Sequence, residues 1–138
     1  MFLKIGKSSV FSPKEIFGKN RIRIYRINKK EDLLMKVKYN TLDKLLVLEL
    51  TEEIDHHSTE KIRRRADYEI QRHIPRKTIF DFSGVTFMDS AGIGMVIGRY
   101  KVISMLGGKV AMINVKPNVK KIFEMSGILK IIPIEDCA

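Results

Sequence analysis

The sequence contains very little cysteine and no long apolar segment. Its 138 residues include a single cysteine, Cys137, which excludes an internal disulfide framework and a cysteine-based metal cluster. The longest apolar run, residues 91–98, stops at Arg99 and is far shorter than the roughly 20 residues that cross a bilayer. Lys4 and Lys7 interrupt the region where a secretory signal needs an apolar block. These absences exclude a membrane span and predict a protein of the reducing cytoplasm.

What the sequence has in excess is positive charge, and the excess is concentrated near the N-terminus. There are 26 Lys+Arg against 16 Asp+Glu, a formal net charge of +10. Residues 1–34 hold nine Lys/Arg and three acids, a net charge of +6, whereas residues 35–138 are only mildly basic at +4. A basic segment of this kind is typical of a nucleic-acid-binding arm. A basic nucleic-acid-binding module is therefore one alternative function, and it would depend almost wholly on residues 1–34.

A second interpretation removes residues 1–34 from the protein. The segment from Lys30 to Met35 can be back-translated as AAG GAG GAT TTA TTA ATG, which contains a purine-rich ribosome-binding site just ahead of a start codon. We therefore expect residues 1–34 to be either a disordered basic leader or a mis-called upstream start, and residues 35–138 to be the folded domain. The nucleotide sequence of the gene decides between the two.

From Met35 onward, hydrophobic periodicity predicts a regular series of strands and helices. We expect strands at 35–39 and 45–51, a helix from Ser58 to His73, a strand at 77–82, a helix at 91–106, a strand at 109–114, a helix at 117–125 and a short edge strand at 131–134. The length fits one domain. The order β-β-α-β-α-β-α-β describes an α/β fold in which helices cover a small mixed sheet.

One segment has the character of a functional site, Asp89-Ser90-Ala91-Gly92-Ile93-Gly94. It lies where a loop enters a predicted helix, and free backbone N–H groups together with the helix dipole make such a position favourable for a phosphate. Phosphorylation of Ser90 would add nearly two negative charges without unfolding the helix, so its effect would fall on a binding surface. The commonplace alternative is that Ser90 is an ordinary helix N-cap.

Two enzyme interpretations fit the same segment poorly. Gly92-x-Gly94-x-x-x-Gly98 imitates a dinucleotide-binding fingerprint, but its spacing is one residue too long and Asn114 stands where an acid is needed. A serine hydrolase would have glycine two residues before Ser90, and this chain has Met88. The sequence therefore predicts no enzyme, and we expect the glycines to let the helix approach a neighbour or a partner closely.

Other features are predicted to be structural. The basic run 63–65 is expected on a solvated helix face, where it could form an electrostatic rim for an acidic partner. The methionines are expected to fill the core; they are Met88, Met95, Met105, Met112 and Met125. Met88 and Ile93 also flank the motif and are expected to supply apolar contact.

Residues 78–101, which contain Phe87-Met88-Asp89-Ser90-Ala91-Gly92, resemble the anti-sigma factor antagonist family, the bacterial group that defines the STAS domain. The resemblance extends upstream to Asp55-His56-His57 and downstream to Gly107-Gly108 and the segment 119–128, so it covers about Met35 to Glu135. This combination of motifs is most similar to the sporulation branch of the family, the antagonists of the anti-sigma F factor.

The resemblance implies roles for particular residues. The family's phosphorylated serine matches Ser90, and Asp89 and Asp55 match the aspartates beside it and in the neighbouring loop. Many members have Ser or Thr where this chain has Ala91, so Ser90 is the only hydroxyl in the motif. His56 and His57 match the loop and are expected to have a surface or capping role. The interface with the kinase is expected to include Asp55, Met88, Asp89, Ser90, Ala91, Gly92, Ile93 and Gly94.

The resemblance also implies a partner-switching cycle. The unphosphorylated protein would bind an anti-sigma factor that is itself a serine kinase, and would so free a sporulation sigma factor. Phosphorylation of Ser90, with ATP held by the kinase, would release the antagonist, and a membrane-bound serine phosphatase of the PP2C type would restore it. The chain itself is expected to need no cofactor or metal and to contact neither nucleic acid nor membrane directly. A general stress sigma factor remains an alternative beneficiary.

Overall fold

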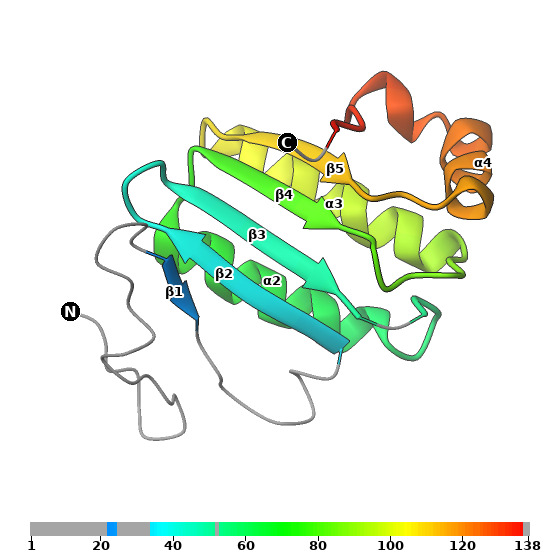
Figure 1. The fold of residues 1–138 in the computed structure, drawn as a ribbon, viewed down its shortest axis with the longest axis horizontal. Coiled ribbons are helices and arrows are strands. Elements are labelled where there is room, and N and C mark those ends of the chain that lie inside the picture. The colour runs from blue at the N-terminus through cyan, green and yellow to red at the C-terminus, as the bar shows by residue number, and fades with distance from the viewer. Residues whose placement is uncertain (1–21, 25–33, 52, 137–138) are drawn as a thin grey trace.

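The structure, a computed structural model, describes residues 22–24, 34–51 and 53–136, with side chains from residue 34 onward. Its centre is a five-stranded sheet in the order β1-β2-β3-β4-β5 (Figure 1). The strands are β1 (Ile22–Ile24), β2 (Met35–Asn40), β3 (Leu45–Leu50), β4 (Lys77–Asp81) and β5 (Lys109–Ile113). The first two pairings are antiparallel and the last two are parallel. This confirms the predicted α/β fold with a mixed sheet.

Strand β1 comes from the segment predicted to be an irregular leader. It pairs antiparallel with β2, with Ile22 opposite Asn40, so for residues 22–24 the expectation of disorder is wrong. The other residues of 1–33 lie outside the described residues, as does Cys137. The predictions of a leader or of an upstream start stay predictions for that part of the chain.

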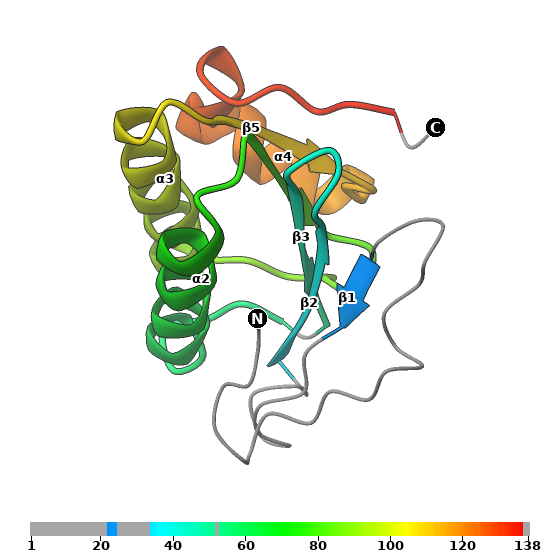
Figure 2. The same ribbon diagram turned by 90° about the vertical axis from the view of Figure 1, so that its left-hand side faces the viewer.

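Helices α2 (Thr59–His73) and α3 (Ser90–Met105) lie side by side on one face of the sheet (Figure 2). Helix α4 (Pro117–Ser126) follows β5 and leads into a short 3-10 helix, η2 (Ile128–Lys130). Alternate residues of β2 and β3 are buried, as period-two patterning requires of a sheet covered on one face. Gly127 ends α4 with φ 82°, a left-handed conformation that glycine adopts without strain.

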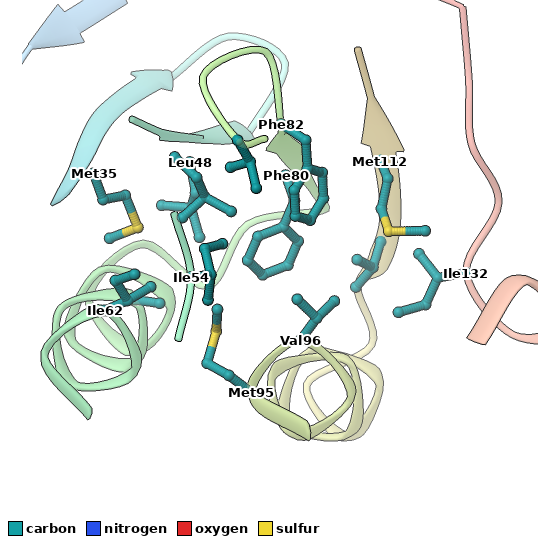
Figure 3. Packing of buried hydrophobic residues seen from close by; sticks show 14 of the residues in the cluster. Met35, Leu48, Ile54, Ile62, Phe80, Phe82, Met95, Val96, Met112 and Ile132 are labelled. Carbon is teal, nitrogen blue, oxygen red and sulfur yellow. The ribbon is translucent and has the colours of Figure 1, made fainter. Parts of the chain in front are cut away.

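The core lies between the sheet and the two long helices. Leu48 and Phe80 point from the sheet toward Ile62 of α2 and Val96 of α3 (Figure 3), and all four side chains are at most 2% exposed. Just after β4, Phe82 meets Phe123 of α4 edge to face, with their ring centroids 5.2 Å apart. This contact attaches α4 to the rest of the domain.

The predicted edge strand at 131–134 is wrong. The 3-10 helix η2 ends just before this segment, and within the segment only Ile134 makes an isolated parallel bridge, to Met112. Pro133 has no N–H to donate to a ladder; its carbonyl accepts from Met112 N at 2.9 Å. From β2 onward the observed order is therefore β-β-α-β-α-β-α.

Two further expectations about burial need correction. Met105 and Met125 are 86% and 87% exposed, so they are not core residues, whereas Met88, Met95 and Met112 are buried. Arg65 is only 5% exposed, because its position on α2 faces inward. Its guanidinium Nε lies 3.8 Å from a carboxylate oxygen of the fully buried Glu69, one helical turn further along.

Candidate functional site

Two loops that are distant in sequence meet at the carboxyl ends of β3 and β4. An isolated parallel bridge joins Ile54 to Met88. Ile54 N donates to the carbonyl oxygen of Phe87 at 3.1 Å, and Asp89 N donates to the carbonyl oxygen of Ile54 at 3.3 Å. Asp55 and Asp89 directly follow the two bridged residues, so they lie on neighbouring segments of the chain. It therefore brings the Asp-His-His loop and the Asp-Ser motif into one site.

Asp89, and not Ser90, is the N-cap of α3. Its Oδ1 accepts hydrogen bonds from Ala91 N at 2.9 Å and Gly92 N at 3.2 Å, which satisfies two of the backbone donors that a helix N-terminus leaves free. Ser90 is the first helical residue and its side chain is exposed. The N-cap alternative for Ser90 is therefore wrong. The phosphate-cradle expectation is weakened as well, because these two N–H groups are already engaged.

Asp55 organises the neighbouring loop. Its Oδ1 accepts from His57 N at 2.8 Å and Ser58 N at 3.0 Å, while Asp55 N donates to Ser58 Oγ at 3.1 Å. The backbone hydrogen bonds from Ser58 and then His57 lower the pKa of Asp55 below its usual value. The His56 and His57 side chains are exposed. Asp55 is thus a charged, locally held group at the edge of the Ser90 site.

Gly92 lets α3 pack closely against the bridged loops. A Cβ at this position would lie 2.8 Å from both Ile54 Cγ2 and Met88 Cγ, which is closer than real Cβ contacts. The predicted close approach is confirmed for Gly92. It is wrong for Gly94 and Gly98 within this chain, since a Cβ on either would meet nothing within 4 Å. Close approach of a partner at Gly94 stays a prediction.

The predicted interface residues divide into a surface set and a supporting set. Ser90 and Gly94 are exposed, and Asp55, Asp89 and Ala91 are partly exposed. Met88, Gly92 and Ile93 are buried, with Met88 only 1% and Ile93 8% exposed. Direct contact between Met88 and a partner is therefore corrected to a supporting role, because the side chain lies in the core beneath the loops.

The sequence did not single out Phe87, which is 47% exposed three positions before Ser90. Its loop is tied to the start of α4, where Lys116 Nζ donates to the carbonyl oxygen of Ser83 and Asn118 Nδ2 donates to that of Thr86. Phe87 and Met88 are adjacent in an extended loop, where neighbouring side chains point in opposite directions, so the sequence indicates that one of the two faces outward. Only the bridge at Met88 decides that it is Phe87.

A recess of about 220 Å³ lies beside the site, between α2 and α3. Ala91 and Gly94 line it near Ser90, and Arg63 and Arg99 line it further along. Arg99 Nε lies 2.7 Å from Asp67 Oδ1. Burial lowers the pKa of Arg99, because a desolvated guanidinium is harder to keep charged. The side chains that line the recess include both acids and bases, so it is not a simple anion site.

Within the described part of the chain, no three His, Cys, Asp or Glu side chains are grouped so that they could hold a metal ion. Among the same residues, no helix has the length and apolar composition needed to cross a membrane.

Comparison with known proteins identifies the family. The family model for the STAS domain matches residues 36–137, and the chain belongs to that family. It is similar to the anti-sigma F factor antagonist of Paenibacillus polymyxa, with 39% identity over 92 residues, covering 67% of this chain and 79% of the relative. The antagonist of the same name from Lysinibacillus sphaericus is 34% identical over 83 residues, which cover 60% of this chain and 71% of the relative.

Solved structures give the same result. The anti-sigma factor antagonist SpoIIAA in its unphosphorylated form superimposes with a TM-score of 0.65 and 29% identity, covering 75% of this chain and 88% of that one. The phosphorylated form of SpoIIAA, described as a Bacillus cell fate determinant, gives a TM-score of 0.59 and 28% identity, covering 75% and 91%. The resemblance stated from the motifs is confirmed at the level of family and fold.

Proposed function

We propose that this protein is an anti-sigma factor antagonist controlled by phosphorylation of Ser90. In its unphosphorylated form it binds an anti-sigma factor that is a serine kinase, and so frees a sporulation sigma factor. The observation that carries the proposal is that Ser90 is exposed at the first residue of α3, directly after Asp89, and that the Ile54–Met88 bridge brings the loop of Asp55 to the same end of the sheet. Relatives that are called anti-sigma F factor antagonists support it.

The switch is a phosphoryl transfer in which this chain supplies only the acceptor. Ser90 Oγ attacks the γ-phosphorus of ATP held by the kinase, the new O–P bond forms, the bond to the β-phosphate oxygen breaks, and ADP leaves. The hydroxyl proton passes to a base on the kinase. The antagonist therefore needs no cofactor and no catalytic group of its own. A PP2C-type phosphatase reverses the modification in the cytoplasm.

Phosphorylation would act locally, by adding charge beside groups that are already engaged or are themselves acidic. The N–H groups of Ala91 and Gly92 are already bonded to Asp89, and Asp55 and Asp89 are themselves acids. A phosphate of nearly two negative charges in the interface would have to be desolvated beside like charges, at a cost of several kcal/mol. Since about 1.4 kcal/mol changes an affinity tenfold, release of the partner requires no refolding.

The test uses the full chain with the anti-sigma kinase encoded beside it and Mg-ATP, followed by peptide mass spectrometry. We expect one phosphate, on Ser90, and none in Ser90→Ala, which still binds the kinase. Ser90→Asp should bind at least tenfold more weakly by calorimetry. Ser83→Ala, another exposed serine at the same end of the molecule, is the matched control and should behave as wild type.

Two results would contradict the proposal. Phosphate on another residue, or equal affinities for wild type and Ser90→Asp, would remove the switch from Ser90. The identity of the sigma factor released when the antagonist is added to kinase–sigma complexes separates a sporulation switch from a general stress switch.

A further inference from the structure

Three turns meet at the end of the sheet opposite Ser90. They comprise residues 41–44, 74–76 and 105–109, which connect β2 to β3, α2 to β4 and α3 to β5. Arg76 N donates to the carbonyl oxygen of Lys44 at 2.8 Å, and Lys109 N donates to that of Arg76 at 3.0 Å. This end faces the viewer in Figure 2. We call these three turns the basic pole.

Each turn of the basic pole presents at least one exposed apolar side chain and one exposed basic side chain. The pairs are Leu42 (64% exposed) with Lys44, Ile74 (52%) with Arg76, and Met105 (86%) with Lys109. Within the described residues none of the three cations makes an ion pair. The one acid in these turns, Asp43, accepts a hydrogen bond from Asn40 Nδ2 at 3.3 Å. The basic pole therefore has a net positive charge with apolar tips between the cations.

Ile74 is the least expected of these residues. It is the C-cap of α2 with φ 45°, in the left-handed region where glycine or asparagine fits and a β-branched residue is strained. Its side chain is also half in solvent. Neither local backbone preference nor core packing accounts for isoleucine at this position, which favours an external contact.

We propose that the basic pole docks peripherally on an anionic lipid bilayer. Anionic headgroups complement the three exposed cations together, and apolar side chains at the tips of turns can enter the boundary between headgroups and acyl chains. A protein partner fits less well, because the cores of protein interfaces are depleted in lysine. Docking leaves the Ser90 site, at the other end of the sheet, accessible, so this inference does not depend on the proposed function.

The proposal changes the expectation drawn from the sequence, which was that the protein contacts no membrane. The absence of a spanning helix among the described residues bears only on insertion across a bilayer. A peripheral contact needs exposed cations and apolar tips on one surface. The fold brings these together from three separate segments of the chain.

The charge test is co-sedimentation of the full chain with phosphatidylcholine vesicles, with and without about one third phosphatidylglycerol. Wild type should bind only the anionic vesicles. The triple variant Lys44→Gln/Arg76→Gln/Lys109→Gln should bind at least tenfold more weakly. The triple variant Lys120→Gln/Lys121→Gln/Lys130→Gln removes the same charge from exposed positions on α4 and η2, and should lose less than twofold. This control also accounts for background attraction by the nine Lys/Arg of residues 1–34.

The apolar test uses two methionines of nearly equal exposure, Met105 at 86% and Met125 at 87%, so neither substitution should disturb the fold. Met105→Gln should weaken vesicle binding several-fold, whereas Met125→Gln should not. Ile74→Asn should weaken it as well while keeping or raising the melting temperature, because asparagine suits the left-handed C-cap. Wild-type stability in this variant excludes misfolding as the cause of lost binding.

Three outcomes would overturn the proposal: no binding of wild type to anionic vesicles, equal binding to neutral vesicles, or equal losses in the two charge triples. If the Lys44/Arg76/Lys109 variant binds vesicles as wild type does but loses affinity for the anti-sigma kinase, the basic pole is a protein interface. That result would reject the lipid surface and leave the Ser90 switch intact.

Discussion

The two ends of the sheet have opposite chemistry. At the Ser90 end, Asp55 and Asp89 accept backbone hydrogen bonds at the starts of α2 and α3. At the basic pole, Arg76 and Lys109 follow the carboxyl-terminal ends of those helices. Helix N-termini favour anions and C-termini favour cations, so the parallel alignment of α2 and α3 accounts for the charges next to the helix ends, but not for Lys44 in the turn between β2 and β3. It does not account for the exposed apolar side chains of the basic pole.

The glycines at the two ends are packed against different kinds of atom. Replacing them gives the largest expected change in the free energy of unfolding. Gly108→Ala should destabilise the fold by about 3 kcal/mol, because a Cβ there would lie 2.8 Å from the carbonyl oxygen of Pro75, a backbone atom that cannot easily move. Gly92→Ala at the Ser90 end should cost only about 1 kcal/mol. Its close contacts are side-chain atoms of Ile54 and Met88, which have more freedom to adjust than a backbone carbonyl. Urea unfolding of the variants measures both.

Gly98→Ala is the control for that pair. A Cβ on Gly98 meets nothing within 4 Å, so the change should stabilise α3 by up to about 1 kcal/mol through helix propensity. If Gly92→Ala and Gly108→Ala lowered the free energy of unfolding equally, the expectation that a Cβ against backbone costs more than a Cβ against side chains would be contradicted.

A smaller effect is expected from the cap of α3. Asp89→Ala should lower the free energy of unfolding by about 1 kcal/mol, because the bonds to Ala91 N and Gly92 N are lost. Ser90→Ala should change it by less than about 0.5 kcal/mol, as expected for an exposed side chain outside the cap. Thermal unfolding of the two variants separates the structural aspartate from the proposed phosphorylation site. A larger loss in Ser90→Ala would reverse these roles.

The smallest effect is the pH dependence that Asp55 contributes. Since hydrogen bonds from Ser58 and His57 lower its pKa in the folded state, the carboxylate stabilises the fold above its ordinary pKa near 3.8. That contribution is lost as the pH falls through the lower folded-state value. The melting temperature of wild type should exceed that of Asp55→Asn at pH near 5, and the difference should shrink on acidification. A difference that grows in acid would contradict the assignment.

Local sequence predicted most of the fold. The elements from β2 to α4 were found to within a residue or two, because hydrophobic periodicity marks their buried faces and Pro75, Gly107 and Gly127 mark their ends. Strand β1 was missed, since a segment of three residues carries too little periodicity to be recognised. The prediction of an edge strand at 131–134 was wrong, because a short apolar run can be buried either as a paired strand or as an irregular turn.

The site was predicted as a set of residues but not as an arrangement. The sequence by itself determined that Asp55, Asp89 and Ser90 lie in two short segments that resemble those of the STAS family, because a motif of residue types and spacings is local to the chain. Only the tertiary structure decided that Asp89 caps α3, that Met88 faces inward while Phe87 faces out, and that Lys44, Arg76 and Lys109 share one surface. Those outcomes depend on the Ile54–Met88 bridge and on the alignment of strands and helices, which are contacts between distant segments that local periodicity does not encode.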